Sequence, residues 1–368
     1  MKKKIFYGWW VTIAAFFTFG FAVGLPYYNI SFFYDYFERA FGWSKADITL
    51  GFPLAALLTI WFGPMVVPRF SPRKLILAGT GLTFLAFLGF GSMNGALWFY
   101  YTLWIVYTIA YLMSGPIPHQ LMVSFWFRKY RGRAMGIMYV GVGLLGSIGS
   151  FICKPLTEAY GFQTALMLLG CLLFLAWPLV LLVLRNRPEE MGLHPDGASE
   201  PAADVKLEPR PLKELLSSYG FWLLLIGSVC SIGSIGAINF HMKFVFLDQG
   251  FTKGPMVDSA WRTASIMILW SSIAGRLSIG YFSDKFSKKW VMFWSYFITA
   301  ATIPLMLMVH PGSEITLYAF AVLFGFGMGA DYMMIPLIAA DQFGVNSLAR
   351  AMAVILPANT IGQTWFPY

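Results

Sequence analysis

The segment from Gln163 to Leu184 reads QTALMLLGCLLFLAWPLVLLVL and carries no charged side chain. A helix needs about 20 apolar residues to cross about 30 Å of hydrocarbon, so this segment is long enough to span a membrane. Comparable apolar stretches lie near residues 8–34, 48–67, 75–92, 97–127, 134–157, 219–247, 259–282, 290–309 and 315–340, and a further one begins near 349. The sequence therefore predicts an all-α, polytopic membrane protein.

Composition supports this fold class. Hydrophobic residues make up 58% of the chain and charged residues 12%, against roughly 25% charged in a soluble domain. The stretches are continuously apolar, whereas strands of a membrane barrel alternate over about 10 residues. The first stretch is too long for a signal peptide and lacks a small-residue cleavage site. The three cysteines are isolated and have no ligand spacing, so neither a metal site nor a cofactor is expected.

The basic excess indicates an orientation rather than a nucleic-acid partner. Formal charge is +9, and 19 of the 26 Lys and Arg residues fall in segments on the same side as the N-terminus. Cytoplasmic loops carry this excess in membrane proteins. We therefore expect a cytoplasmic N-terminus, a plasma (inner) membrane location and contact with the lipid bilayer.

Three short repeats divide the chain into two halves. YGWW at 7–10 recurs as YGFW at 219–222, RFSPRK at 69–74 as KFSKK at 285–289, and RAM at 133–135 again at 350–352. The offsets are 212, 216 (between the phenylalanines) and 217. The repeats predict an N-terminal six-helix bundle at 1–185, a polar, proline-rich cytoplasmic linker at 186–216, and a C-terminal bundle at 217–368.

The repeat also predicts where the second half stops. Position 368 corresponds to about position 151 of the first half, in the middle of the fifth helix. We expect part of the eleventh helix and the twelfth helix to be missing from this sequence, so that the C-terminal bundle is incomplete.

One helix has glycines at close-packing spacing. Gly141, Gly143, Gly146 and Gly149 lie in the stretch 134–157. Small residues at such spacing let membrane helices approach closely. We expect this helix to pack tightly against a neighbour. The run also mimics a dinucleotide-binding pattern, but no strand precedes it.

Loop motifs resemble those of the major facilitator superfamily. GYFSDKFSKK at 280–289 is similar to the family signature between the eighth and ninth helices, and its counterpart at 63–74 has Val67 in place of the usual acid. WFRKYRGRAMGI at 126–137, YGWW at 7–10 and RPEEMGLHP at 187–195 resemble the monocarboxylate-porter and oxalate/formate-antiporter branches. The resemblance implies two bundles related by a pseudo-twofold axis, and gating roles for Gly280, Asp284, Lys285, Arg131 and Arg133.

Arg276 is the main candidate for substrate binding. It lies inside the stretch 259–282, one helical turn before Gly280. A charge at membrane depth is costly unless it is paired or hydrated, and a guanidinium binds a carboxylate through two parallel hydrogen bonds. The resembled branches carry a carboxylate-binding arginine at this place. The alternatives are that Arg276 reaches the cytoplasmic surface or has an internal partner.

Two residues are candidates for proton coupling. Asp331 is the only carboxylate deep within an apolar stretch, and burial and a nearby arginine shift a carboxyl pKa in opposite directions. A permanent pair between Asp331 and Arg276 is the equal alternative. His241 lies in the outer part of the stretch 219–247, and histidine titrates near physiological pH. A purely interfacial histidine is the competing interpretation.

Other polar groups in apolar stretches are further candidates for substrate contact. His119 follows two prolines that bend its helix and free backbone carbonyls; a packing role is as plausible. The resemblance implies that Tyr27, Tyr28 and Asn29 meet a substrate across the cavity from Arg276, although tyrosines also form interfacial belts. Tyr332 sits beside Asp331.

These features predict a proton-coupled symporter of a small monocarboxylate that works by alternating access and is expected to be monomeric. The alternatives are an anion exchanger for oxalate- or formate-like dicarboxylates and a membrane sensor that does not transport. No nucleophile–base pair or phosphate loop is present in the sequence, so we do not expect an enzyme.

Overall fold

The computed structural model describes residues 5–199, 208–252 and 255–365. The N-terminal lysine run and residues 200–207 of the predicted linker lie outside the described residues. Throughout the described ranges the regular structure is helical. The all-α prediction is confirmed.

The first half of the chain forms helices α1 to α10. Their bounds are α1 Tyr7–Phe19, α2 Leu25–Asn29, α3 Tyr34–Phe41, α4 Lys45–Leu58, α5 Phe62–Val66, α6 Pro72–Gly91, α7 Leu97–Ser114, α8 Pro116–Trp126, α9 Arg131–Leu172 and α10 Ala176–Leu182. A π-helical turn, Gly20–Gly24, joins α1 to α2, and short 3-10 turns connect α2 to α3, α5 to α6 and α9 to α10.

The second half follows a polar connection. Two 3-10 turns, Pro188–Met191 and Pro195–Gly197, and the short helix α11 (Leu212–Leu216) lie in that connection. The remaining helices are α12 Tyr219–Asp248, α13 Pro255–Lys285, α14 Lys288–Met306, α15 Glu314–Phe343 and α16 Leu348–Trp365.

Several helices are long and apolar enough to cross a membrane. In the described ranges, six helical runs meet that requirement, and a seventh does if α4 and the segment Phe62–Arg69, which meet at a 43° bend, form one span. The predicted stretches 259–282 and 290–309 also form helices, α13 and α14. Gly161, at φ 78° and ψ 159°, interrupts α9 between the predicted stretches 134–157 and 163–184.

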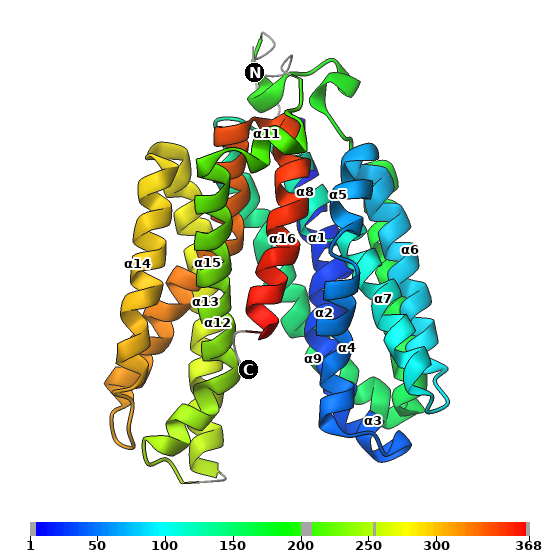
Figure 1. Cartoon of the computed structure of the whole chain (residues 1–368), viewed down its shortest axis with the longest axis vertical. Coiled ribbons are helices and arrows are strands. Elements are labelled where there is room, and N and C mark those ends of the chain that lie inside the picture. The colour runs from blue at the N-terminus through cyan, green and yellow to red at the C-terminus, as the bar shows by residue number, and fades with distance from the viewer. Residues whose placement is uncertain (1–4, 200–207, 253–254, 366–368) are drawn as a thin grey trace.

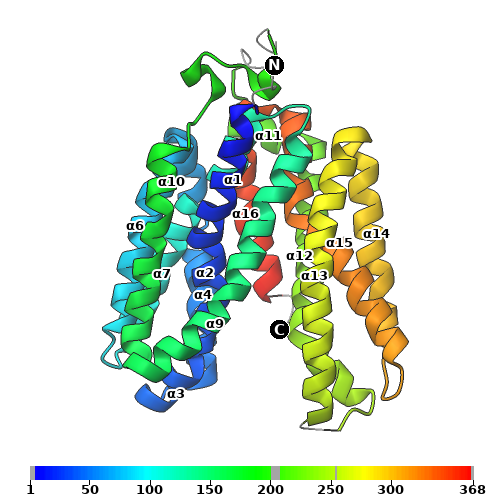
Figure 2. The same ribbon diagram turned by 180° about the vertical axis from the view of Figure 1, so that it is seen from behind.

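The helices form two groups. Helices α1 to α10 pack mainly among themselves, as do α12 to α16, and α9 against α13 is the most extensive contact between the groups. In both views the groups approach each other at the end where α11 lies, here called the linker end, and diverge toward the opposite end (Figures 1 and 2). Helix α16 lies between them and contacts α4, α5 and α8.

The glycine row of α9 packs closely against neighbouring helices, as its spacing predicts. A Cβ atom on Gly146 would lie 3.1 Å from the carbonyl oxygen of Gly24, and Gly141 is packed against the backbone of Phe16 in α1. Gly143 faces the other group, where a Cβ would lie 3.0 Å from Nη1 of Arg276. Small side chains therefore let α9 contact α1, α2 and α13 at the same time.

Candidate functional site

At the linker end, the first turn of α9 is bound by an acid from the other group of helices. The backbone N–H groups of Gly132 and Arg133 donate to Oδ1 and Oδ2 of Asp284 at 2.7 and 3.2 Å. The Arg133 guanidinium adds an ion pair at 3.4 Å, and the Asp284 side chain is 4% exposed. Burial raises the pKa of Asp284, whereas the two N–H bonds and Arg133 oppose that rise. Asp284 thus links the two groups of helices.

Glycines allow the close approach that this contact requires. A Cβ on Gly280 would lie 2.6 Å from the carbonyl oxygen of Gly132, and one on Gly132 would lie 2.7 Å from Oδ1 of Asp284. Real Cβ atoms essentially never come that close to other heavy atoms, so neither position accepts a larger residue without a shift of α9, α13 or the Asp284 side chain.

The other signature residues lie around this contact. Arg131, itself 5% exposed, pairs with Asp341 of α15 at 3.4 Å, and Lys288 binds the second oxygen of Asp341 at 2.6 Å. Lys285 lies over the ring of Tyr281 at 4.5 Å. Arg131, Arg133, Gly280 and Asp284 therefore meet across the two groups, and Lys285 contacts only a tyrosine of its own helix in the interactions that the structure describes.

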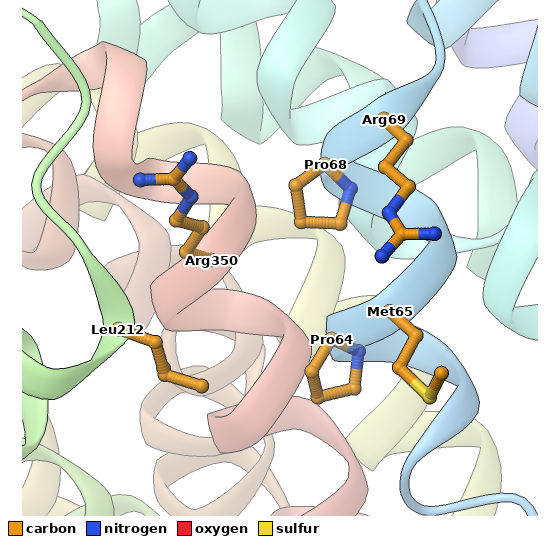
Figure 3. A pocket seen from close by; sticks show the side chains of 6 residues that line it. All are labelled: Pro64, Met65, Pro68, Arg69, Leu212 and Arg350. Carbon is orange, nitrogen blue, oxygen red and sulfur yellow. The ribbon is translucent and has the colours of Figure 1, made fainter.

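The equivalent region of the first half differs. Val67, four residues after Gly63, stands where Asp284 stands after Gly280, and it is buried at 1% exposure. Nearby, a pocket of about 180 Å³ lies between the α5 region and α16. Figure 3 shows its lining, with Arg350 on α16 and Arg69 at the end of the α5 segment on opposite sides of two prolines. This pocket belongs to the linker end and does not include Arg276.

Arg276 lies where α13 faces α9. Its carbonyl oxygen would lie 2.5 Å from a Cβ on Gly136, and its Nη1 faces Gly143. Within the described residues its one polar contact of hydrogen-bonding length is to the Ser272 hydroxyl, at 3.4 Å, and no acid pairs with it. The phenols of Tyr28 and Tyr139 lie near enough to interact with it electrostatically. Arg276 is therefore a half-buried cation between the two groups of helices.

The α2 candidates point in different directions. Tyr28 is 55% exposed and lies beside Gly146 of α9. The Tyr27 ring packs against those of Tyr28, Phe52 and Tyr111, with centroids 5.4 to 5.7 Å apart. Asn29 is 3% exposed; its amide donates to the carbonyls of Leu25 and Gly146 at 2.8 and 2.9 Å. Asn29 thus joins α2 to α9.

His119 is enclosed within the first group of helices. Its side chain is fully buried and stacks on Phe19, with ring centroids 4.8 Å apart. Nδ1 lies 2.8 Å from the carbonyl oxygen of Gly115, and Nε2 lies 3.0 Å from the Thr18 hydroxyl. A carbonyl only accepts, so the network assigns the proton to Nδ1 and lets Nε2 accept from Thr18. Both ring nitrogens have partners.

Asp331 and Tyr332 are adjacent in α15 but face different neighbours. Asp331 is 1% exposed, and the Ser231 hydroxyl of α12 donates to its Oδ2 at 2.7 Å. Its Oδ1 has no partner of good hydrogen-bonding geometry among the described residues, although the Tyr296 phenol of α14 lies beside it. Tyr332 donates to Gln363 of α16 at 2.6 Å. No ion pair joins Asp331 to Arg276 in the described part of the chain.

His241 lies on an exposed part of α12, with its ring 6.4 Å from that of Phe244. His241 is therefore exposed, whereas Asp331 is buried. In the described residues, no three His, Cys, Asp or Glu side chains gather in a way that could hold a metal ion.

The connection between the halves is bound to the linker end. Asp196, which has a positive φ of 59°, accepts hydrogen bonds from the backbone N–H groups of Arg128, Lys129 and Tyr130 at 2.9, 2.7 and 3.3 Å. A carboxylate that satisfies three consecutive backbone donors fixes the α8–α9 loop. This contact could not be predicted from the sequence, because a polar linker residue is usually solvated.

Several further polar side chains inside apolar stretches contact the candidates and were not predicted from the sequence. Arg276 has Tyr139 nearby. Asp331 accepts a hydrogen bond from Ser231 and lies beside Tyr296. Tyr332 donates a hydrogen bond to Gln363. In the sequence they are marked only by a hydroxyl or amide group within an apolar stretch. Many such groups bond only to the backbone of their own helix, so this feature does not single out a functional residue.

Comparisons with known proteins agree on one family. The sequence profile of the Major Facilitator Superfamily matches residues 15–367. The chain is 26% identical over 317 residues to "MFS transporter asaE" of Aspergillus flavus, covering 83% of this chain and 66% of that protein. It is 24% identical over 341 residues to "Fujikurins efflux protein" of Gibberella fujikuroi, covering 88% and 67%. The chain thus spans about two thirds of the length of these relatives.

A solved structure has the same fold. The proton:xylose symporter XylE superposes with a TM-score of 0.68 at 15% identity, covering 98% of this chain and 88% of that one. At this identity the similarity concerns the fold.

Proposed function

Because the chain belongs to the major facilitator superfamily, we propose that it is a secondary active transporter of a small organic anion, most specifically a proton-coupled monocarboxylate symporter. It works by alternating access in the plasma (inner) membrane with its N-terminus in the cytoplasm. The family places it among membrane transporters; substrate, coupling ion and orientation are our proposal.

The unpaired guanidinium of Arg276 carries the proposal. It lies between α9 and α13, and in the described chain only the Ser272 hydroxyl reaches it at hydrogen-bonding length. Leaving a cation without an anionic partner at membrane depth is costly, so an anionic passenger would relieve that cost. A guanidinium also offers two parallel donors to a carboxylate. The nearby phenols of Tyr28 and Tyr139 supply further donors to the same substrate.

Tyr332 and Gln363 extend this site in our proposal, since Tyr332 lies near enough to Tyr28 to interact with it electrostatically and donates to Gln363 of α16. His119 and Asn29 take supporting roles, because their polar atoms are already bound within the first bundle. Tyr27 shapes the aromatic wall behind Tyr28.

Asp331 is the proposed proton carrier. It is 1% exposed, and an ionised carboxylate in such a place is costly, so it would take up a proton when the site closes. His241, on the exposed part of α12, is a second proton-exchange group nearer to solvent. The contact of Asp284 with α9 is the proposed cytoplasmic gate, and its hydrogen bonds to Gly132 and Arg133 support this role.

Uptake into proteoliposomes tests the proposal. Labelled monocarboxylates are offered with and without an inward-directed proton gradient to the wild type and to Arg276→Lys. We expect gradient-driven uptake that the lysine variant loses, because an ammonium cannot replace the bidentate fork. Arg262→Lys, the same exchange at an exposed position of α13, is the matched control and should retain uptake.

Other outcomes separate the alternatives. Uptake of dicarboxylates by exchange, without a gradient effect, would favour an anion exchanger. Ligand binding without flux would favour a sensor. Export of an apolar product would replace the organic anion as substrate; efflux is the activity that the name of the Gibberella fujikuroi relative gives to that protein.

A further inference from the structure

A buried polar cluster lies inside the second bundle, away from Arg276. Ser228 and Ser231 of α12, Tyr296 of α14, Asp331 of α15 and Asn359 of α16 form it. Ser231 donates to Asp331, and Ser228 lies 2.8 Å from Oδ1 of Asn359. The two serines are three residues apart and therefore lie on the same face of α12. The two serines therefore bring their contacts with Asp331 and Asn359 to one face of α12, and α14, α15 and α16 supply the other side chains.

Several atoms of this cluster lack a well-formed hydrogen bond. Oδ1 of Asp331, the hydroxyl of Tyr296 and Nδ2 of Asn359 are buried, and none of them makes a hydrogen bond of good geometry among the described residues, although the Tyr296 phenol lies beside the Asp331 carboxylate. The side chains of Asp331 and Asn359 are 1% and 0% exposed. Leaving buried polar atoms unpaired costs free energy comparable to the loss of a hydrogen bond for each of them. The concentration of such atoms in one place points to a ligand.

The hydrogen bonds of the Ser228 hydroxyl indicate which atom of the Asn359 amide is left without a partner. It lies within hydrogen-bonding distance of two acceptors, Oδ1 of Asn359 at 2.8 Å and the carbonyl oxygen of Leu225 at 2.9 Å. One hydroxyl proton serves only one acceptor. If the Asn359 amide is turned over, Ser228 donates to Leu225 and accepts from Nδ2, and the oxygen of the amide becomes the free atom. Amide orientation is assigned from such networks.

With this orientation the unpaired atoms are all oxygens. They are a carboxylate oxygen, a phenol oxygen and an amide oxygen, with the Ser231 hydroxyl beside them. Oxygen sets of this kind bind hard cations. The cluster holds a single carboxylate, so one positive charge neutralises it, whereas a divalent ion would leave a net charge in an apolar bundle.

We propose that this cluster binds a monovalent alkali cation, with sodium as the probe, in place of the proton on Asp331. The ion would be held by Asp331, Tyr296, Asn359 and Ser231. This extends the proposed function by adding a second coupling ion at the same carboxylate. It does not require that a monocarboxylate be the substrate, because the ion binds inside the second bundle.

Sodium binding to the purified full chain is the test. Radioactive sodium is titrated by scintillation proximity with choline chloride holding ionic strength constant, and thermal unfolding is followed in parallel. We expect saturable binding and a sodium-dependent rise in the unfolding temperature of the wild type. Asp331→Asn should abolish both. Ser231→Ala should weaken binding by about tenfold or more, the scale expected for losing one contact to a charged group.

Ser234→Ala is the matched control. Ser234 lies one turn further along α12, is half-buried, and donates to its own helix at the Cys230 carbonyl. It should bind sodium as the wild type does. Absence of saturable sodium binding in the wild type would overturn the proposal, as would equal binding by Asp331→Asn. If Asp331→Asn does not fold, Ser231→Ala and Ser234→Ala decide, and equal affinity in both refutes the site.

Failure of this proposal and failure of the proposed function are distinguishable. A protein that takes up monocarboxylate on a proton gradient but ignores sodium refutes only the cation site. One that binds sodium but does not move monocarboxylates refutes only the substrate.

Discussion

Replacing Gly280 by alanine should open the gate at the linker end. The added Cβ would lie 2.6 Å from the carbonyl oxygen of Gly132, about 0.8 Å inside the 3.4 Å at which ordinary contact begins. The atom it meets is backbone in the first turn of α9, which cannot rotate away. Overpacking of this kind costs about 1–3 kcal/mol. Alanine also favours the helix itself, but that gain is equal in the open and closed states because α13 is helical in both.

The shift in population follows from that cost. Since about 1.4 kcal/mol is a factor of ten, the closed state should become about 5 to 150 times less populated relative to the open one. Distances between spin labels report this change. The labels are placed at Lys74→Cys and Lys289→Cys, exposed residues near the linker end of the two bundles, after the exposed Cys171 and Cys230 have been changed to serine. The distance distribution should broaden toward longer values in Gly280→Ala.

Gly227→Ala is the control, because it makes the same exchange within a helix where a Cβ would meet no atom within 4 Å. It should leave the distances unchanged. An unaltered distribution in Gly280→Ala, or an equal change in the control, would show that the glycine contact does not limit closure.

Three further changes test other parts of the molecule. Asp331→Asn keeps an acceptor for Ser231 but cannot exchange a proton, so uptake into proteoliposomes should lose its dependence on the pH gradient while substrate binding persists; a retained dependence would assign coupling elsewhere. His119→Phe removes the hydrogen bonds to Thr18 and Gly115, so the free energy of unfolding should fall by about 1–3 kcal/mol, measured as a lower unfolding temperature. The pH profile of uptake should stay unchanged; an altered profile would give His119 a role in proton coupling. Asp196→Ala frees three backbone donors and should speed trypsin cleavage at Arg128 and Lys129; equal cleavage rates would mean that the linker contact does not hold the α8–α9 loop.

Much of the architecture follows from local sequence. Each membrane helix must satisfy its own backbone hydrogen bonds in lipid, so a long apolar run specifies a helix without help from the rest of the chain. The break at Gly161 falls between two such runs. The glycine row of α9 indicated close packing for the same reason, since only small residues let helices approach.

The contact between the two groups at the linker end was partly predictable as well. The signature around Gly280 and Asp284 marked these residues, and the structure brings them to Gly132 and Arg133. What the loop pattern did not reveal was how Asp284 acts: it binds the backbone of the opposite bundle, a contact between residues about 150 positions apart along the chain.

The orientation of single polar side chains was decided by tertiary structure alone. Asp331 and Tyr332 are neighbours in sequence, yet one bonds to α12 and the other to α16, because successive helical residues point about 100° apart. In a soluble helix, polar periodicity would tell which side faces the core. Here lipid and protein interior are both apolar, so the sequence named the charged residues within the membrane, and only packing determined which of them face each other.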